Sequence, residues 1–261
     1  MKNTAILLST TNGYAAQAAA MHRQLAAFGV AERAWLVPLE PLDAAAEATL
    51  RGLFPGRRTA VLDVPYGVKT SGNKPFLPTM VPPHDHYLLL DTDLVVLRAE
   101  FFAAFARGPD DAITLVADTF TVADYLGAAP SHAPRFAAFP GLDRRPYLQT
   151  GAIGLPRAAF VALREELYAG LRRAAAATTT GDLQAWNHLA AAHPERFRLL
   201  APEACLVLRP DGGGFSTGIH RPDVRWRGGA PEHRGAPVLC LHYTHSGGAV
   251  RTLQDYADLY T

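Results

Sequence analysis

Short apolar segments alternate with amphipathic ones over roughly the first 120 residues of the chain, and this alternation restricts the fold to few architectures. Four segments have the length and composition of buried strands: 4–9, 34–37, 60–64 and 87–90. Residues 14–28 and 41–53 carry apolar side chains at helical spacing, and Gly29 follows the first of these segments. Strands that alternate with helices predict an α/β fold with a mostly parallel sheet and helices on both faces.

The second half of the chain continues this pattern with longer interruptions. Residues 112–117 and 147–155 are expected strands, and residues 157–177 and 182–192 are expected helices. Stretches rich in glycine and proline are expected to be irregular: 66–83, which has room for one helical turn, 127–146, and much of 204–243. A chain of 261 residues has the size of one α/β domain, so we expect a single domain.

Composition excludes several classes of protein. The formal net charge is +1, which gives no electrostatic basis for binding nucleic acid. Cys205 and Cys240 are the only cysteines, too few for a disulfide framework, and a reducing compartment is the simpler interpretation. The apolar run 5–8 is too short for a secretory signal, and no stretch reaches the ~18 apolar residues of a spanning helix. We therefore expect a cytoplasmic protein without a transmembrane segment.

Two carboxylates stand at the end of an expected buried strand. Asp91 and Asp93 directly follow the apolar residues 87–90, and the small polar residues 9–12 follow the first strand. Open parallel sheets bind ligands at the carboxyl ends of their strands, where both segments are expected to lie. Side chains two residues apart on an extended segment project to the same side, so their like charges repel unless a cation or a proton lies between them. The pair suits a hard divalent cation that also bridges phosphates, and the alternative is a solvated turn between two strands.

Six segments, in the same order along the chain, resemble motifs of glycosyltransferase family 8, which has the GT-A fold and includes glycogenin-like enzymes. Residues 7–14 are similar to the family's first strand and nucleotide-binding loop, and residues 87–96 to its metal-binding block. The other four are a basic residue seventeen positions before Asp91 (Lys74), an aromatic-x-Asn-Ser-Gly strand (147–151), an Asp-Gln-x-x-x-Asn helix start (181–187) and a late metal-binding histidine (241–243).

The chain departs from the family's motifs at three places. Gln149 replaces the usual asparagine, and Leu183 replaces the usual glutamine of the Asp-Gln pair. After His242, Thr-His-Ser-Gly-Gly stands at 244–248 in place of Gly-x-x-Lys-Pro-Trp. These departures concern the acceptor side and the subfamily more than the fold or the nucleotide site.

The resemblance implies a GT-A-type, Rossmann-like mixed sheet in a single domain. Within it, a nucleotide-binding half is expected at about 1–125 and an acceptor-binding half at about 126–261. It also implies transfer of a sugar from a nucleotide diphosphate sugar, most simply a UDP-sugar, to an acceptor that the sequence does not identify. Family members retain the anomeric configuration, and the same outcome is expected here.

The resemblance assigns Asp91, Asp93 and His242 as metal ligands. Two carboxylates and an imidazole favour Mn2+ over Mg2+, because imidazole is the softer ligand, and Mg2+ is the alternative. Lys74 would neutralise phosphate charge, including the negative charge that develops on the leaving diphosphate. The competing interpretations are a structural histidine at a strand end for His242 and a solvated loop lysine for Lys74.

The remaining site residues are expected on the donor. The residues expected to hold the nucleotide and its sugar are Thr10, Thr11, Asn12, Tyr14, Thr92 and Asp118, and the catalytic candidates are Gln149, Asp182 and Gln184. Tyr14 would stack on the base, and Asp118 would bind sugar hydroxyls. Structural roles are the alternatives: a core aromatic for Tyr14, helix caps for Asp118 and Asp182, and a surface residue for Gln184.

Two other functions remain open. A nucleotidyltransferase that makes nucleotide sugars would carry a glycine-rich, basic signature after the first strand, which residues 10–13 lack. A non-catalytic nucleotide-sugar-binding relative is disfavoured by the intact set of metal ligands, but Leu183 leaves it open. The sequence does not determine the oligomeric state, or whether His245 and the loop 212–214 take part.

Overall fold

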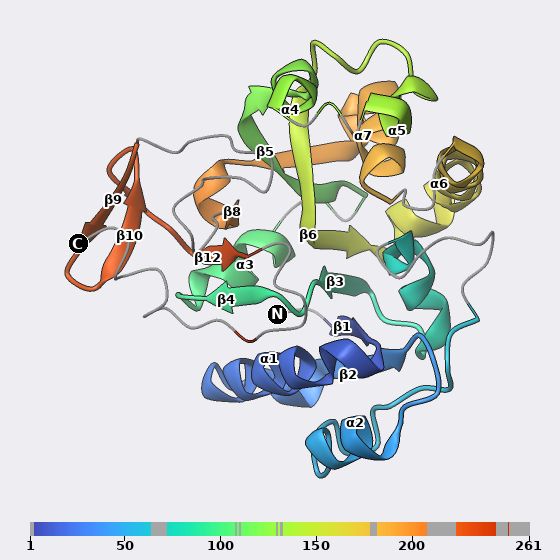
Figure 1. Cartoon of the computed structure of the whole chain (residues 1–261), viewed down its shortest axis with the longest axis vertical. Coiled ribbons are helices and arrows are strands. Elements are labelled where there is room, and N and C mark those ends of the chain that lie inside the picture. Colours follow the sequence, from blue (N-terminus) through green and yellow to red (C-terminus); the bar gives the residue numbers. More distant parts are fainter. Residues whose placement is uncertain are drawn as a thin grey trace.

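The computed structural model describes residues 3–63, 72–107, 109, 111–128, 130, 133–177, 182–207, 223–243 and 250. Its centre is a six-stranded sheet with the strand order β2 (Ala34–Pro38), β1 (Thr4–Thr10), β3 (His86–Leu90), β6 (Pro146–Pro156), β5 (Ile113–Thr121) and β7 (Phe197–Leu200) (Figure 1). β6 is antiparallel to both of its neighbours, and the other pairs in the sheet are parallel. The predicted mixed, mostly parallel sheet is therefore confirmed.

Helices cover both faces of this sheet. The α-helices are α1 (Ala15–Ala27), α2 (Ala44–Thr49), α3 (Glu100–Ala106), α4 (Val122–Ala128), α5 (Ala133–Ala137), α6 (Arg157–Ala177) and α7 (Asp182–Ala192), and the longest 3-10 helix is η5 (Lys74–Met80). In the described part of the chain, no helix combines the length and the apolar character needed to cross a membrane.

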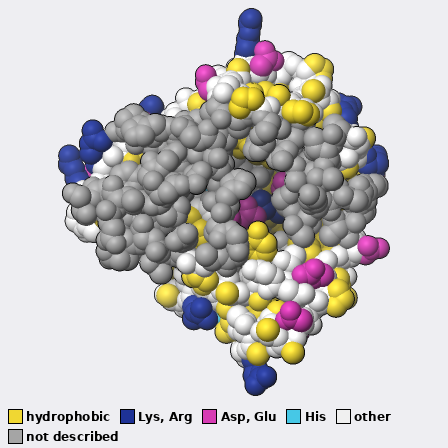
Figure 2. Space-filling view, in the orientation of Figure 1, with side chains coloured by type: hydrophobic (Ala, Val, Ile, Leu, Met, Phe, Trp, Pro, Cys, Tyr) yellow, Lys and Arg dark blue, Asp and Glu magenta, His cyan; other side chains and the backbone are white. Residues whose placement is uncertain are grey.

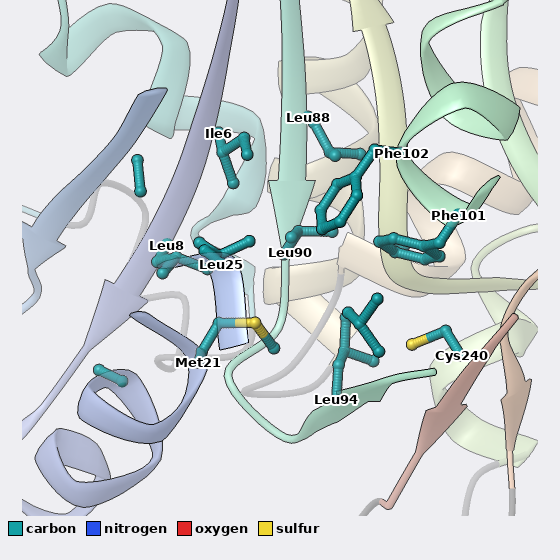
Figure 3. Close-up of a cluster of buried hydrophobic side chains, with 14 of the residues drawn as sticks. Ile6, Leu8, Met21, Leu25, Leu88, Leu90, Leu94, Phe101, Phe102 and Cys240 are labelled. Carbon is teal, nitrogen blue, oxygen red and sulfur yellow. The ribbon is translucent and has the colours of Figure 1, made fainter. Parts of the chain in front are cut away.

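Each face of the sheet has its own buried cluster. Ile6 and Leu8 of β1 pack with side chains of α1 and α3, which point toward one another in Figure 3. Ala5 and Leu7 face the other way and pack in the cluster that contains α6 and α7. Successive residues of a strand point to opposite faces, so a strand that is covered on both sides has to be apolar throughout.

Two three-stranded sheets lie outside the central one. The first consists of β4 (Leu94–Val96), β12 (Cys240–His242) and β8 (Leu206–Val207), and the second of β9 (Val224–Arg227), β10 (Ala230–His233) and β11 (Ala236–Pro237), at the left of Figure 1. β12 is antiparallel to β4, so that His242 lies opposite Leu94. This pairing brings the late histidine beside the segment that follows β3.

Most of the predicted elements are confirmed, and the helices expected at 157–177 and 182–192 have the predicted bounds. The helix expected at 41–53 is shorter, because Asp43 caps it and accepts a hydrogen bond from the Ala46 N–H at 2.8 Å. The strand expected at 60–64 is wrong over its described residues, 60–63, which come after α2 and donate one hydrogen bond to the end of β2 without forming a strand. The irregular stretch expected at 127–146 contains the short helix α5.

We predict that Gly154→Ala destabilises the fold by about 1–3 kcal/mol, because overpacking forces the backbone to move. A Cβ at Gly154 on β6 would lie 2.5 Å from the Phe105 carbonyl oxygen of α3. Urea unfolding followed by circular dichroism measures the change. Gly127→Ala in α4 is the matched control, because a Cβ there meets no atom within 4 Å. Equal unfolding midpoints for the two variants would contradict the close packing of α3 on β6.

Candidate metal centre and active site

Three ligand groups from two distant parts of the chain converge where β3, β4 and β12 meet. Asp91 follows β3, and its backbone N–H donates to the Gly151 carbonyl at 2.8 Å. Asp93 precedes β4, and its carbonyl accepts the Tyr243 N–H at 3.0 Å, next to His242 at the end of β12. The His242 Nε2 atom lies 3.2 Å from Asp93 Oδ1 and 3.7 Å from Asp91 Oδ2. The three residues predicted as metal ligands therefore offer ligand atoms within 4.8 Å of one another.

The charges of this cluster are strongly coupled. Burial alone would lower the pKa of His242, but the carboxylates of Asp93 and Asp91 outweigh it and raise the pKa to about 9. Burial raises the pKa of Asp91, and the ammonium of Lys74 opposes that rise. The imidazole therefore carries a proton at neutral pH in the metal-free protein, and this positive charge lies between two carboxylates.

The donor set fits a divalent metal ion. Two carboxylates and one imidazole on one small volume are ligands of a kind that Mn2+ accepts, and a cation there would replace the proton of His242. His242 is almost fully buried, whereas the side chains of Asp91 and Asp93 are 30% and 20% exposed, so the carboxylates face the open side of the site.

Lys74 is a buried part of the same cluster and not a solvated loop lysine. Its Nζ donates to Asp91 Oδ2 at 2.8 Å and to the Thr150 carbonyl at 2.5 Å. The nearest oxygen of Asp182 lies 3.7 Å from it. Burial would lower the pKa of Lys74, but the carboxylates of Asp91 and Asp182 outweigh it and raise the pKa. The lysine is therefore charged.

Asp182 and Gln184 face inward from the first turn of α7. Burial raises the pKa of Asp182 to about 6 against the opposing effect of Lys74. Among the described residues, Asp182 Oδ2 has no hydrogen-bond partner. Gln184 is buried, so the interpretation as a surface residue is wrong. Asn187, three residues further along α7, fixes this helix to β6 by exchanging two hydrogen bonds of 3.0 Å with the backbone of Leu148.

Gln149 and Asp118 form a second buried polar pair. The Gln149 Nε2 donates to Asp118 Oδ2 at 2.7 Å. Asp118 lies within β5 and caps no helix, because β5 continues to Thr121. In the described part of the structure, Gln149 Oε1 has no hydrogen-bond partner. An acceptor that is buried and unpaired in this way suits a ligand hydroxyl.

A cavity of about 180 Å3 adjoins the two carboxylates. Its walls are Ser9, Thr10, Thr11, Tyr14, Gln17, Leu39, Asp91, Thr92 and Asp93. Tyr14 is 40% exposed and therefore not a core aromatic. In the same orientation as Figure 1, Figure 2 shows a hollow near the ends of β3 and β6 in which acidic and basic side chains lie together. A larger cavity of about 740 Å3 lies at the opposite end of the sheet, around Thr4 and His86, away from the carboxylates.

Asn12 does not line the cavity, whereas its neighbours Thr10, Thr11 and Tyr14 do. Its Nδ2 donates to the Pro41 carbonyl at 3.3 Å, and its Oδ1 accepts the Asp43 N–H at 2.8 Å. The side chain thus shapes the loop beside the cavity without forming its wall. The loop 212–214 and His245 lie outside the described residues.

Sequence reasoning did not single out Gly151, Gln17 or the Thr150 carbonyl. The glycine belonged to a recognised motif, but a Cβ there would lie 2.5 Å from His242 Nδ1, and this closeness depends on the pairing of β12, which the sequence does not reveal. Gln17 lies on α1 at a spacing that also fits an ordinary core position, and its Oε1 is 3.4 Å from the Thr92 hydroxyl. A backbone carbonyl leaves no signal in the sequence.

Comparisons with known proteins agree with this geometry at the level of the fold. No protein-family model matches the sequence, and neither does any functionally curated protein. The galactosyltransferase LgtC, solved with donor and acceptor sugar analogues, aligns with a TM-score of 0.60 and 14% identity over 97% of this chain and 94% of its own. Mouse xyloside xylosyltransferase 1 aligns with a TM-score of 0.52 and 14% identity over 94% of this chain and 98% of its own. The bifunctional glycosyltransferase WbbM aligns with a TM-score of 0.64 and 15% identity over 98% of this chain, which spans 49% of WbbM. The chain therefore has the GT-A fold of glycosyltransferases, as the motif resemblance implied.

Proposed function

We propose that the protein is a metal-dependent glycosyltransferase that moves a sugar from a nucleotide diphosphate sugar, a UDP-sugar, to an acceptor with retention of anomeric configuration. The observation that carries the proposal is the convergence of Asp91, Asp93 and His242 beside a cavity on a GT-A fold. Transfer releases a nucleoside diphosphate, so the site needs positive charge next to the leaving group. Held by these three residues, Mn2+ or Mg2+ would stabilise that charge as a Lewis acid.

The nucleoside part of the donor would occupy the cavity between β1 and the segment 91–93. Thr10, Thr11 and Thr92 line its wall, and Tyr14 offers a partly exposed ring on which a base can stack. In this arrangement the diphosphate would extend toward Asp91 and Asp93, because they form the end of the same cavity. The nucleotide thus contacts residues from the first half of the chain.

Lys74 would act on the diphosphate from its buried position beside Asp91. Its ammonium is charged and close to Asp91, so it adds positive potential at the place where the leaving group gains charge. The same contact orients the Asp91 carboxylate, because Lys74 is itself fixed by the Thr150 carbonyl.

The sugar would lie over β6 and the first turn of α7. Gln149 and Asp118 present the buried acceptors expected to bind its hydroxyls, and Asp182 and Gln184 would face the anomeric carbon. Leu183, which stands where the family has glutamine, packs against the cluster around Val122 and Tyr125. This placement keeps a second candidate open, namely a relative that binds nucleotide sugars without turning them over.

We predict that Asp91→Asn combined with Asp93→Asn lowers Mn2+-dependent release of UDP from the UDP-sugar that the wild type turns over fastest by at least about 10²–10³-fold, because the charge-stabilising ion is lost. A coupled assay for UDP, run with and without Mn2+, measures the rate. Asp85→Asn is the matched control, since Asp85 is exposed at the far end of β3. Unchanged turnover in the double variant would refute the metal assignment. Binding of the donor to the wild type without any turnover would favour the non-catalytic relative.

We predict that Gln149→Met weakens binding of the whole donor about 10–100-fold and leaves the affinity for UDP within about twofold. The substitution keeps the length of the side chain but removes the amide, which costs about 1–3 kcal/mol where a buried hydrogen bond is lost. Isothermal titration of UDP and of the UDP-sugar separates the two effects. An equal loss for both ligands would mean that Gln149 does not face the sugar.

We predict that Mn2+ binds more tightly as the pH rises from about 6.5 toward about 9. Below the pKa of His242, about 9, the imidazole holds a proton that the metal must displace. The affinity therefore increases by up to about tenfold per pH unit and levels off above that pKa. Titration of Mn2+ by electron paramagnetic resonance gives the profile, and His242→Gln should flatten it. A wild-type profile that is flat in this range would exclude His242 as a ligand.

A further inference from the structure

β6 passes directly behind the metal cluster at Gly151. A Cβ built on this residue would lie 2.5 Å from Nδ1 and 2.7 Å from Cε1 of His242. Gly151 is not among the glycines with positive φ, so its backbone conformation is open to any residue. The obstacle to a side chain at this position is therefore the imidazole of His242 and not the backbone.

The His242 ring has few other features that define its orientation. Its Nε2 faces the two carboxylates, at 3.2 Å from Asp93 and 3.7 Å from Asp91. Its Nδ1 is buried and has no hydrogen-bond partner among the described residues. A metal-binding histidine usually donates from its second nitrogen to a fixed acceptor, which sets the plane of the ring. Here the ring instead lies against the bare Cα of Gly151.

The same residue also locates the first carboxylate. The Gly151 carbonyl accepts the Asp91 N–H at 2.8 Å, just beyond the last paired residues of β3 and β6. The neighbouring Thr150 carbonyl accepts Lys74. Two consecutive carbonyls of β6 thus hold Lys74 and the backbone of Asp91 in place. The absence of a side chain at Gly151 leaves room for the His242 ring.

We propose that Gly151 is a positioning residue whose lack of a side chain forms the seat of the His242 imidazole and directs Nε2 toward Asp91 and Asp93. The link to metal binding rests on the proposed function. The seat itself is a property of the metal-free protein and can be tested without the metal.

The test is a double-mutant cycle on Gly151 and His242. Gly151→Ala should raise the dissociation constant for Mn2+ about 10–100-fold, the range seen when the group that orients a metal ligand is lost. In the His242→Ala background the clash is absent, so adding Gly151→Ala should change the constant by less than about twofold. Gly127→Ala, with open space at its Cβ, is the control and should bind Mn2+ as the wild type does.

Two measurements on the metal-free protein complete the test. The ring resonances of His242, assigned by their absence in His242→Ala, should shift in Gly151→Ala and remain in place in Gly127→Ala. The loss of thermal stability in Gly151→Ala should be relieved in the double variant. The proposed role of Gly151 would be wrong if the ring resonances did not change, or if the loss of stability persisted fully without His242. Failure of the wild type to bind Mn2+ would instead contradict the proposed function. The ring resonances would still show whether Gly151 positions the His242 ring.

Discussion

The confinement of like charges in one small volume is the constraint on which the site depends. Asp91, Asp93 and Asp182 lie around Lys74, and burial raises the pKa of Asp91 and of Asp182. In the metal-free protein, Lys74 and the protonated His242 supply the compensating charge. A divalent cation that displaces the proton of His242 would, with Lys74, balance three carboxylates completely. The metal-free cluster would thus keep one uncompensated negative charge, which a bound divalent cation would remove.

The antiparallel strand β6 explains how a mostly parallel sheet builds such a cluster. β3 ends at Leu90, which pairs with Ala152, so β6 continues past the point where Asp91 leaves the sheet. Residues 149–151 therefore lie beside the segment that follows β3. A parallel neighbour would end at the same level as β3 and could not extend there. Gln149 contacts Asp118, the Thr150 carbonyl accepts Lys74, and the Gly151 carbonyl accepts Asp91. The reversal of one strand places three consecutive residues around the site.

Local pattern in the sequence was enough for the features that depend on local physics. The apolar run before Asp91 predicted a strand that delivers two carboxylates to one edge, and helical spacing predicted the bounds of α6 and α7. The apolar composition of 60–64 was equally suggestive, yet its described residues form no strand. The segment lies beside the edge strand β2, where the Leu62 N–H donates to the Pro38 carbonyl at 2.8 Å, but no continuous ladder forms, and composition does not record how far two segments pair. For the same reason the burial of Lys74 and the structural bonds of Asn12 depend on contacts with distant segments.

The departures from the family's motifs at described residues, Gln149 and Leu183, lie away from the three metal ligands in the sequence and belong to β6 and α7. A metal cluster tolerates little variation, because its ligands must meet within a few ångströms, and its three predicted residues do so here. Sugar recognition tolerates more, because hydroxyl groups can be bound from several directions. Gln149 extends one methylene further than asparagine and still reaches Asp118, while Leu183 turns into an apolar cluster. The side chains proposed to contact the diphosphate thus match the family's motifs, whereas Gln149 and Leu183, on the proposed sugar side, depart from them.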